Sequence, residues 1–213
     1  ENTYFNIKIR QTDFALVKEN IIAKRYTIVN GNKLDLDLSF LVRSKLYSND
    51  NNMVSGKVID NGLIQYNHDF SFSIFTNKNI SGHRINDVES CFREAVLTDK
   101  DYIGMSNDSA VSYNLGQLKS GDQIDFTLFI YIENNNNIKM EELEEKIENY
   151  KKIDVNKEYT QAKKYWTNYL EKHDGLNLRE NSNKLVNDRV KEIYKRTILL
   201  FPLLQNEETG GAS

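Results

Sequence analysis

The chain has 213 residues, of which 39% are hydrophobic and 28% are charged, and its formal net charge is -3. This is the composition of a globular protein, and the mild negative charge gives no long-range attraction for phosphate backbones, so nucleic acid is not an expected partner. The single cysteine, Cys91, excludes an intramolecular disulfide framework, and no apolar run approaches the roughly 18 residues of a membrane-spanning helix.

From residue 5 to about residue 132, hydrophobic side chains recur at every second position. Such alternation places one set of side chains on one face of a sheet and predicts strands with a buried side. Roughly ten short strands with no helical window between them predict an antiparallel β-sandwich over residues 1–135. The clearest runs cover residues 5–9, 34–42, 70–74 and 124–132. The turn signals are Asn30-Gly31, Asn61-Gly62 and Ser120-Gly121-Asp122, which supply the positive φ of tight hairpins.

After residue 134 the hydrophobic period changes to 3.6. Met140, Leu143, Ile147 and Tyr150 form one stripe, which predicts an amphipathic helix. A second helix is expected over residues 156–173, with an end at Gly175 that suits a left-handed C-cap. These two helices form a predicted helical linker, residues 136–181.

A third helix is expected to begin near residue 182 or 183 and becomes apolar on every side over residues 198–204. A helix that is apolar all round needs neighbours on all sides, and burying each large side chain is worth about 1.5–3 kcal/mol. The polar or small residues 205–213 cannot supply that cover. We therefore expect residues 182–213 to be the start of a truncated second domain; the alternative is that the sandwich alone wraps this helix.

No metal site and no cofactor are predicted. The three histidines, His68, His83 and His173, stand far apart and form no metal-binding motif. Asp35 and Asp37 alternate on one predicted strand, so both are expected on the same solvated face. Asp99, Asp101 and Asp108 could decorate a calcium loop, but they lack the EF-hand spacing and are also expected on a solvated surface.

No catalytic residue is predicted on this chain either. Cys91 is expected to be a half-buried strand residue rather than a reactive thiolate. Glu207 and Glu208 are adjacent, so their side chains diverge. The glutamates within residues 141–148 are expected on the solvated face of a helix. Neither set resembles the paired carboxylates of a glycosidase, which flank a bound sugar. Gly210-Gly211 follows a helix instead of opening one, which is the wrong polarity for a phosphate loop.

Three aromatic side chains could stack on sugar rings, but the sequence assigns no substrate-binding residue among them. Tyr66, Tyr102 and Trp166 are the candidates. Trp166 lies at helical spacing with Ala162 and Leu170, so it is expected to pack into a seam between domains instead.

Several stretches resemble a known family. The run VKEIYKRTILL at 190–200, followed by NEETGGAS at 206–213, resembles the opening of the catalytic domain in bacterial and archaeal glucoamylases, which form glycoside hydrolase family 15. The segment YWTNYL at 165–170 is similar to the interdomain linker of that family. The segments LIQYNHD at 63–69 and YNLGQLKSGD at 113–122 resemble strands of its N-terminal sandwich.

This resemblance implies a β-supersandwich, a helical linker and the first helix of an (α/α)6 barrel, in the order of the periods described above. It further implies a non-catalytic N-terminal region that packs on a catalytic barrel and supports it, in an inverting enzyme that releases glucose from α-glucans. The catalytic glutamates of that family lie beyond the matched positions, so none is assigned to a residue here.

Two other functions remain open. A disaccharide phosphorylase has sandwich, linker and barrel in the same order, and its activity would differ in the use of phosphate. A stand-alone carbohydrate-binding or adhesion sandwich would bind glycan by itself and would satisfy its C-terminal helix internally.

Overall fold

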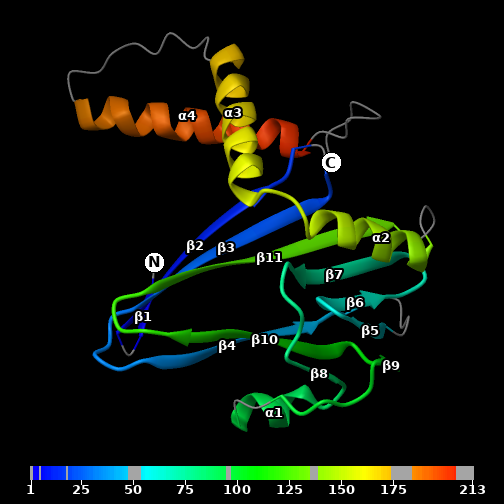
Figure 1. Ribbon diagram of the computed structural model, residues 1–213. Coiled ribbons are helices and arrows are strands. Elements are labelled where there is room, and N and C mark those ends of the chain that lie inside the picture. The colour runs from blue at the N-terminus through cyan, green and yellow to red at the C-terminus, as the bar shows by residue number, and fades with distance from the viewer. Residues whose placement is uncertain are drawn as a thin grey trace. The chain divides into compact units, whose positions relative to one another are not determined.

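The computed structural model describes residues 2–4, 6–17, 19–47, 54–94, 97–134, 139–173 and 184–204. The chain divides into two compact units, Glu1–Val155 and Asn156–Ser213. The first unit is an antiparallel β-sandwich with two helices, and the second unit is helical (Figure 1). The predicted fold class, a sandwich followed by helices, is therefore confirmed, whereas the domain limits 1–135, 136–181 and 182–213 stay a prediction.

Two sheets form the sandwich, and every pairing between neighbouring strands is antiparallel. In spatial order, the eight-stranded sheet consists of β1 (Asn2–Tyr4), β2 (Ile7–Ala15), β3 (Ile21–Asn30), β11 (Gln123–Asn134), β7 (Phe70–Thr76), β6 (Gly62–Tyr66), β5 (Ser55–Ile59) and β9 (Ile103–Met105). The three-stranded sheet consists of β4 (Leu36–Lys45), β10 (Asp108–Leu118) and β8 (Gly82–Ile85).

The large sheet buries apolar side chains on both of its faces. On β11, Phe126 and Leu128 face the three-stranded sheet, where they share a core with Val111 and Tyr113 of β10. The next residue, Phe129, faces the other way and stacks on Phe75 of β7, with ring centroids 5.3 Å apart. Because successive residues of a strand point to opposite faces, both faces of this sheet need cover.

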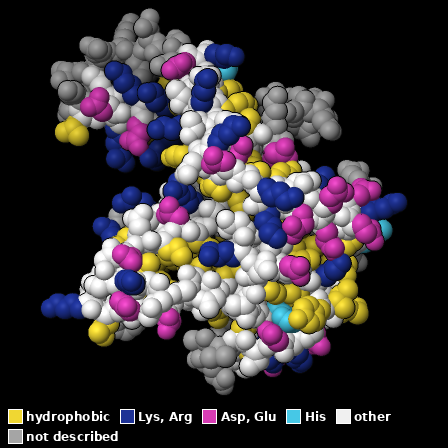
Figure 2. Space-filling view, in the orientation of Figure 1, with side chains coloured by type: hydrophobic (Ala, Val, Ile, Leu, Met, Phe, Trp, Pro, Cys, Tyr) yellow, Lys and Arg dark blue, Asp and Glu magenta, His cyan; other side chains and the backbone are white. Residues whose placement is uncertain are grey.

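Helix α2 (Met140–Tyr150) covers the second face (Figure 1). Its Leu143 and Ile147 are buried in the same cluster as Ile64 and Phe75 of the sheet, which confirms the predicted amphipathic stripe. The opposite side of the helix is exposed and acidic, and charged side chains gather there in Figure 2. Burial of two large aliphatic side chains, each worth about 1.5–3 kcal/mol, holds α2 on the sheet.

The first predicted strand, residues 5–9, is interrupted. Asn6 has a φ of 58°, and the pairing of Tyr4 with Ile7 makes β1 and β2 a hairpin around it. Asparagine tolerates the left-handed region better than most residues, so the turn falls there despite the alternating pattern. Phe5 lies outside the described residues.

Asn30-Gly31 does not form the predicted hairpin, because β3 and β4 lie in different sheets. The chain passes from one sheet to the other at a corner after β3, and the buried side chain of Asn30 stabilises this corner. Its Nδ2 donates to the carbonyl oxygens of Leu34 and Leu118, each at 2.9 Å, and its Oδ1 accepts from the Asn32 N–H. Gly31 has no positive φ. A larger residue is excluded at this position because its Cβ would lie 2.6 Å from the Asn6 carbonyl oxygen.

Of the other two predicted hairpin turns, the one at Asn61-Gly62 forms and the one at Ser120-Gly121-Asp122 does not. The β5–β6 hairpin is confirmed by the pairing of Ile59 with Gly62, although Gly62 is needed for its close contact with β7 rather than for a positive φ. Gly121 does have a positive φ of 81°, but β10 and β11 belong to different sheets, so the turn links the two layers of the sandwich.

A short helix, α1 (Val88–Glu94), lies where only strands were expected. Cys91 is therefore a buried helical residue and not a half-buried strand residue, which corrects that prediction. The seven-residue helix buries Val88 and Cys91 one turn apart, and a helix of two turns is too short to reveal a helical period in the sequence.

The second unit contains α3 (Val155–His173), most of whose length was predicted, and α4 (Lys184–Leu204). The expected apolar side of α4 is largely exposed: Leu185 is 82% exposed, Ile193 56% and Leu200 54%, whereas Ile198 is buried. Gly175, residues 182–183 and residues 205–213 lie outside the described residues. No described helix is long and apolar enough to cross a membrane.

We expect Asn30→Ala to lower the free energy of unfolding by about 1–3 kcal/mol, because the buried carbonyl oxygen of Leu118 and the partly buried one of Leu34 lose their donor. Urea unfolding with an unchanged slope measures this loss. The matched control is Asn79→Ala, at an exposed position, which should change stability by less than about 0.5 kcal/mol. Equal effects of the two substitutions would contradict the role of the corner.

Candidate functional site

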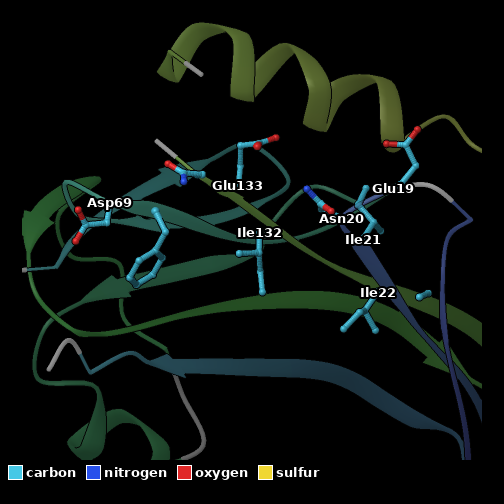
Figure 3. A pocket seen from close by; sticks show the side chains of 10 residues that line it. Glu19, Asn20, Ile21, Ile22, Asp69, Ile132 and Glu133 are labelled. Atoms are coloured by element: carbon cyan, nitrogen blue, oxygen red, sulfur yellow. The ribbon is translucent and has the colours of Figure 1, made fainter. Parts of the chain in front are cut away.

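A hollow of about 640 Å³ lies where β3, β7 and β11 end at one side of the large sheet (Figure 3). We call it the sheet-end hollow. A volume of this size is in the range of small-molecule sites. Its lining residues are Ala15, Glu19, Asn20, Ile21, Ile22, Asp69, Phe70, Ile132, Glu133 and Asn134.

Isoleucines supply an apolar floor to the hollow. Ile22 and Ile132 share strand parity with Ile28 and Leu128, so they point to the sheet face that packs on the three-stranded sheet. Their neighbours further along the strands are buried in that core, but Ile22 is 43% exposed and Ile132 48% exposed. The floor is thus the open continuation of the sandwich core.

Carboxylates on the rim are held by α2 and by the strand beneath it. The Tyr150 hydroxyl donates to Oε2 of Glu19 at 2.6 Å. Lys146 Nζ donates to Oε2 of Glu133 at 3.2 Å, and the Tyr131 hydroxyl donates to the same oxygen. The Tyr131 and Tyr150 rings lie against each other, with centroids 5.7 Å apart, so the two halves of this network are in contact.

This network shifts the ionisation of its members. Burial alone raises the pKa of Glu133, but hydrogen bonds from Tyr131 and Lys146 outweigh burial and hold the pKa below its ordinary value. Burial and the bond to Glu19 raise the pKa of Tyr150. Hydrogen bonds to Tyr131 and Glu133 raise the pKa of Lys146. Glu133 therefore stays ionised and Tyr150 protonated at neutral pH.

A second hollow, of about 380 Å³, lies beside α2 and the β5–β6 turn. Lys57 and Glu144 form an ion pair on its wall. Asn61 also lines it, with a buried side chain whose Nδ2 donates to the Thr76 carbonyl oxygen. Across the described part of the chain, no group of three or more His, Cys, Asp or Glu side chains could hold a metal ion.

The aromatic residues considered for sugar stacking fall on separate elements. Tyr66 ends β6 and packs beside the α2 core. Tyr102 precedes β9 and lies over the ring of buried His83, with centroids 4.2 Å apart. Trp166 contacts Tyr165 and Tyr169 on its own helix, and its predicted place in an interdomain seam stays a prediction.

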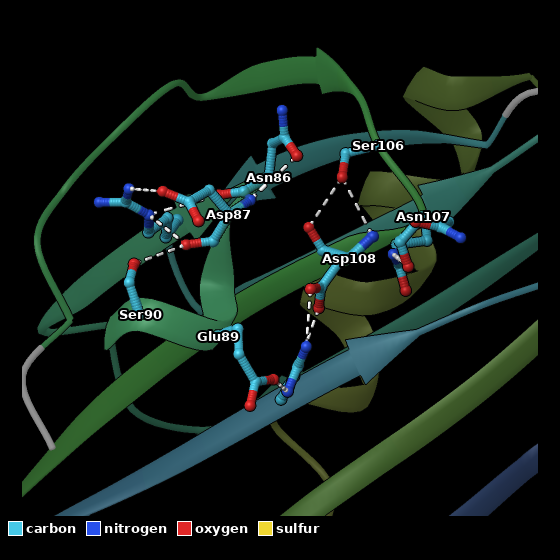
Figure 4. Close-up of polar contacts among 10 residues, drawn as sticks. Asn86, Asp87, Glu89, Ser90, Ser106, Asn107 and Asp108 are labelled. Carbon is cyan, nitrogen blue, oxygen red and sulfur yellow. Dashed lines mark hydrogen bonds and ion pairs between the residues drawn. The ribbon is translucent and has the colours of Figure 1, made fainter. Parts of the chain in front are cut away.

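Among the aspartates expected on a solvated surface, Asp108 is an exception. Arg43 donates to both of its carboxylate oxygens at 2.8 Å and also to Glu89 of α1, which fixes α1 to the three-stranded sheet (Figure 4). Asp99 is exposed and accepts from the His83 backbone N–H. The remaining three, Asp35, Asp37 and Asp101, are exposed as predicted.

The predicted wet face of the first helix is confirmed except at Glu144, which is half-buried against Lys57. Glu207, Glu208 and Gly210-Gly211 lie outside the described residues. Sequence reasoning missed Glu19 and Glu133, because only the pairing of β3 and β7 with β11 brings them to one hollow. The sole local signal was a charge at Glu133, directly after the apolar run 128–132.

Comparison with known proteins shows likeness in structure only. No family model and no curated protein matches the sequence. A bacterial glucoamylase in complex with acarbose matches with a TM-score of 0.58 and 15% sequence identity, over 78% of this chain and 25% of that one. A putative kojibiose phosphorylase from the human microbiome matches with a TM-score of 0.53 and 14% identity, over 76% of this chain and 21% of that one.

The fold is one that occurs in a bacterial glucoamylase. The resemblance drawn from the sequence is thus confirmed at the level of the fold, and the phosphorylase that was left open shares it. This chain spans about a quarter of the length of the glucoamylase structure. Since one fold can carry several activities, the likeness by itself assigns none of them.

At pH 7 we expect Glu133→Gln to lower the free energy of unfolding, because the ionised carboxylate accepts charge-assisted bonds. A carboxyl group with a lowered folded pKa stabilises the fold above its unfolded pKa of about 4.3, and this stabilisation is lost as pH falls through the folded pKa. The gap between wild type and variant should therefore shrink below about pH 4. Urea unfolding at several pH values measures it, with exposed Glu141→Gln as the control that should show no such gap.

Proposed function

We propose that this chain is the non-catalytic N-terminal region of a glucoamylase-like glycoside hydrolase that acts on α-glucans. The sandwich would pack on a catalytic helical barrel and support it, and α4 would be the first helix of that barrel. The fold likeness to a glucoamylase supports the class of enzyme. The exposed apolar side chains of α4 support the role, and they are the observation that carries the proposal.

The energetics of α4 favour a partner. Leu185, Ile193 and Leu200 are each more than half exposed, and they lie along the full length of the helix. Each would contribute about 1.5–3 kcal/mol on burial, so further helices packed around α4 would be strongly favoured. A stand-alone adhesion sandwich would instead bury the apolar side chains of all its helices within itself.

The described residues also fit a supporting role. Apart from the half-buried Glu158 of α3, their carboxylates are either exposed or engaged with Lys, Arg or Tyr, as Glu133 is with Lys146 and Asp108 with Arg43. A glycosidase needs an acid and a base on opposite sides of a bound sugar. We therefore place the chemistry on the barrel of the parent protein and substrate support on this chain.

A disaccharide phosphorylase is the second candidate, because the kojibiose phosphorylase structure matches nearly as much of this chain. The two candidates differ in the acceptor of the glucosyl group. An assay of the parent protein on maltose and kojibiose, with and without inorganic phosphate, separates them. Phosphate-dependent formation of glucose 1-phosphate would favour the phosphorylase, and phosphate-independent release of glucose the hydrolase.

The purified chain alone should release no glucose from maltose or maltodextrin, because the proposal places the catalytic groups elsewhere. A coupled glucose assay at high protein concentration measures this, with a commercial glucoamylase as the positive control. Glucose release that co-purifies with the chain through two chromatographic steps would overturn the proposal.

The chain should also bind an apolar dye such as ANS through α4. Replacing Ile193 and Leu200 together by Lys should reduce the fluorescence several-fold, with little change in thermal midpoint, because both positions are exposed. The control is Asp188→Lys, which adds a lysine to the same helix without removing apolar surface. Absence of dye binding by the unmodified chain would favour the stand-alone sandwich.

A further inference from the structure

We propose that β4 pairs with β4 of a second copy of this chain, antiparallel and across a two-fold axis at Leu41. The three-stranded sheets of the two copies would then join into one sheet. This inference is independent of the proposed function, because it rests on the edge of the smaller sheet. Among the strands that the structure describes, only β10 pairs with β4, which leaves the other side of β4 as an open edge (Figure 1).

The open edge of β4 stands out by its length. Of the described strands, β1 and β9 end the larger sheet with three residues each, and β8 ends the smaller sheet with four, whereas β4 has ten. Short edge strands, prolines and bulges all hinder pairing with another chain. β4 contains no proline, and the irregularity in its pairing with β10 falls at Leu115 of β10. A long and continuous edge of this kind is a template for another strand.

The backbone groups on the open side of β4 belong to its odd-numbered residues. Directly after β4, the Leu46 N–H donates to the Asn107 carbonyl oxygen, so the even-numbered residues direct their N–H and C=O groups at β10. Consecutive residues of an antiparallel strand direct these groups to opposite sides. The groups on the open side are therefore those of Asp37, Ser39, Leu41, Arg43 and Lys45.

The side chains of these five residues complement their own reversed order. They lie on the face turned away from the shared core, because the apolar residues between them pack into that core. Antiparallel pairing about Leu41 places Asp37 opposite Lys45 of the second copy, once on each side of the axis. Both side chains are exposed, and an opposite-charge pair of facing residues contributes about 0.2–1 kcal/mol.

The register is selected by the contacts that Arg43 already makes. A shift by two residues would put Asp37 opposite Arg43, but the Arg43 guanidinium donates to both oxygens of Asp108 at 2.8 Å and also to Glu89. An aspartate facing an engaged guanidinium gains less than one facing an exposed ammonium. In the proposed register the residue opposite Arg43 is Ser39, whose small side chain leaves those bonds intact.

A second copy fits this edge better than an unrelated strand. The edge carries a negative charge near one end and a positive charge at the other, so a reversed copy presents the opposite charge at each end. On the core side the same register places Phe40 opposite Val42 of the second copy, which continues the apolar face across the joint. A peptide without this pattern would match only one end.

Cysteine crosslinking of the full chain tests the pairing and its register. Leu41→Cys should form a disulfide-linked dimer on mild oxidation, because hydrogen-bonded facing residues have Cα atoms about 5.5 Å apart, within reach of a disulfide. The matched control is Ser39→Cys, which should give no linked dimer, because the two positions would lie about 13 Å apart along the strands. The unmodified chain, whose Cys91 is buried, should also give none.

A charge reversal measured by sedimentation equilibrium tests the complementarity. We expect the chain to dimerise and Asp37→Lys to weaken the dimer at least tenfold, because it sets like charges opposite each other on both sides of the axis. Adding Lys45→Asp to Asp37→Lys should restore the dimer, since the pair is then reversed but complementary. Asp69→Lys, at an exposed position outside β4, should dimerise like wild type.

Several outcomes would overturn the proposal. They are a chain that stays monomeric at its highest soluble concentration, equal crosslinking of Leu41→Cys and Ser39→Cys, and a double variant that is folded but dimerises no better than Asp37→Lys. Loss of the dimer when Ile193 and Leu200 are replaced by Lys would also overturn it, by placing the association on α4. The proposed function is tested separately, by glucose release and by dye binding to α4.

Discussion

The large sheet of this protein has to be covered on both faces, and most of the structure follows from that requirement. Its central strand β11 carries Phe126 and Leu128 on one face and Phe129 and Tyr131 on the other, all of them buried. The three-stranded sheet covers the first face and α2 covers the second. Beyond the end of the smaller sheet, β3 and β11 continue with the side chains of Ile22 and Ile132 exposed, and these side chains line the hollow.

Helix α2 links the stability of the sandwich to the shape of the hollow. Its buried side, Leu143 and Ile147, holds it on the sheet. Its Lys146 and Tyr150 reach from that fixed position to Glu133 and Glu19 on the rim. Side chains that position others are most effective when they stand on a well-packed element, and α2 meets that condition.

The functional conclusion combines two different kinds of support. The fold occurs in a glucoamylase and in a phosphorylase, and a shared fold narrows the class of protein without selecting an activity. The exposed apolar length of α4 adds a physical requirement for a partner. Together they support the proposal that this chain belongs beside a catalytic helical domain, with support as its contribution.

Sequence alone determined the elements whose periodicity is long and regular. The strands β4, β7 and β11 and the helices α2 and α3 were all predictable, because each spans enough residues for a period of two or of 3.6 to emerge. The short helix α1 and the turn at Asn6 were not, since a few residues carry no period.

Tertiary structure decided which strands share a sheet and therefore where the site lies. Asn30-Gly31 resembles a hairpin signal, yet the Asn30 amide bonds to the Leu118 carbonyl oxygen, 88 residues away, and turns the chain into the second sheet. Glu19, Asp69 and Glu133 meet for the same reason, because long-range strand pairing aligns three distant segments. Local patterns record which face of a strand is buried, whereas pairing partners depend on contacts between residues far apart in the chain.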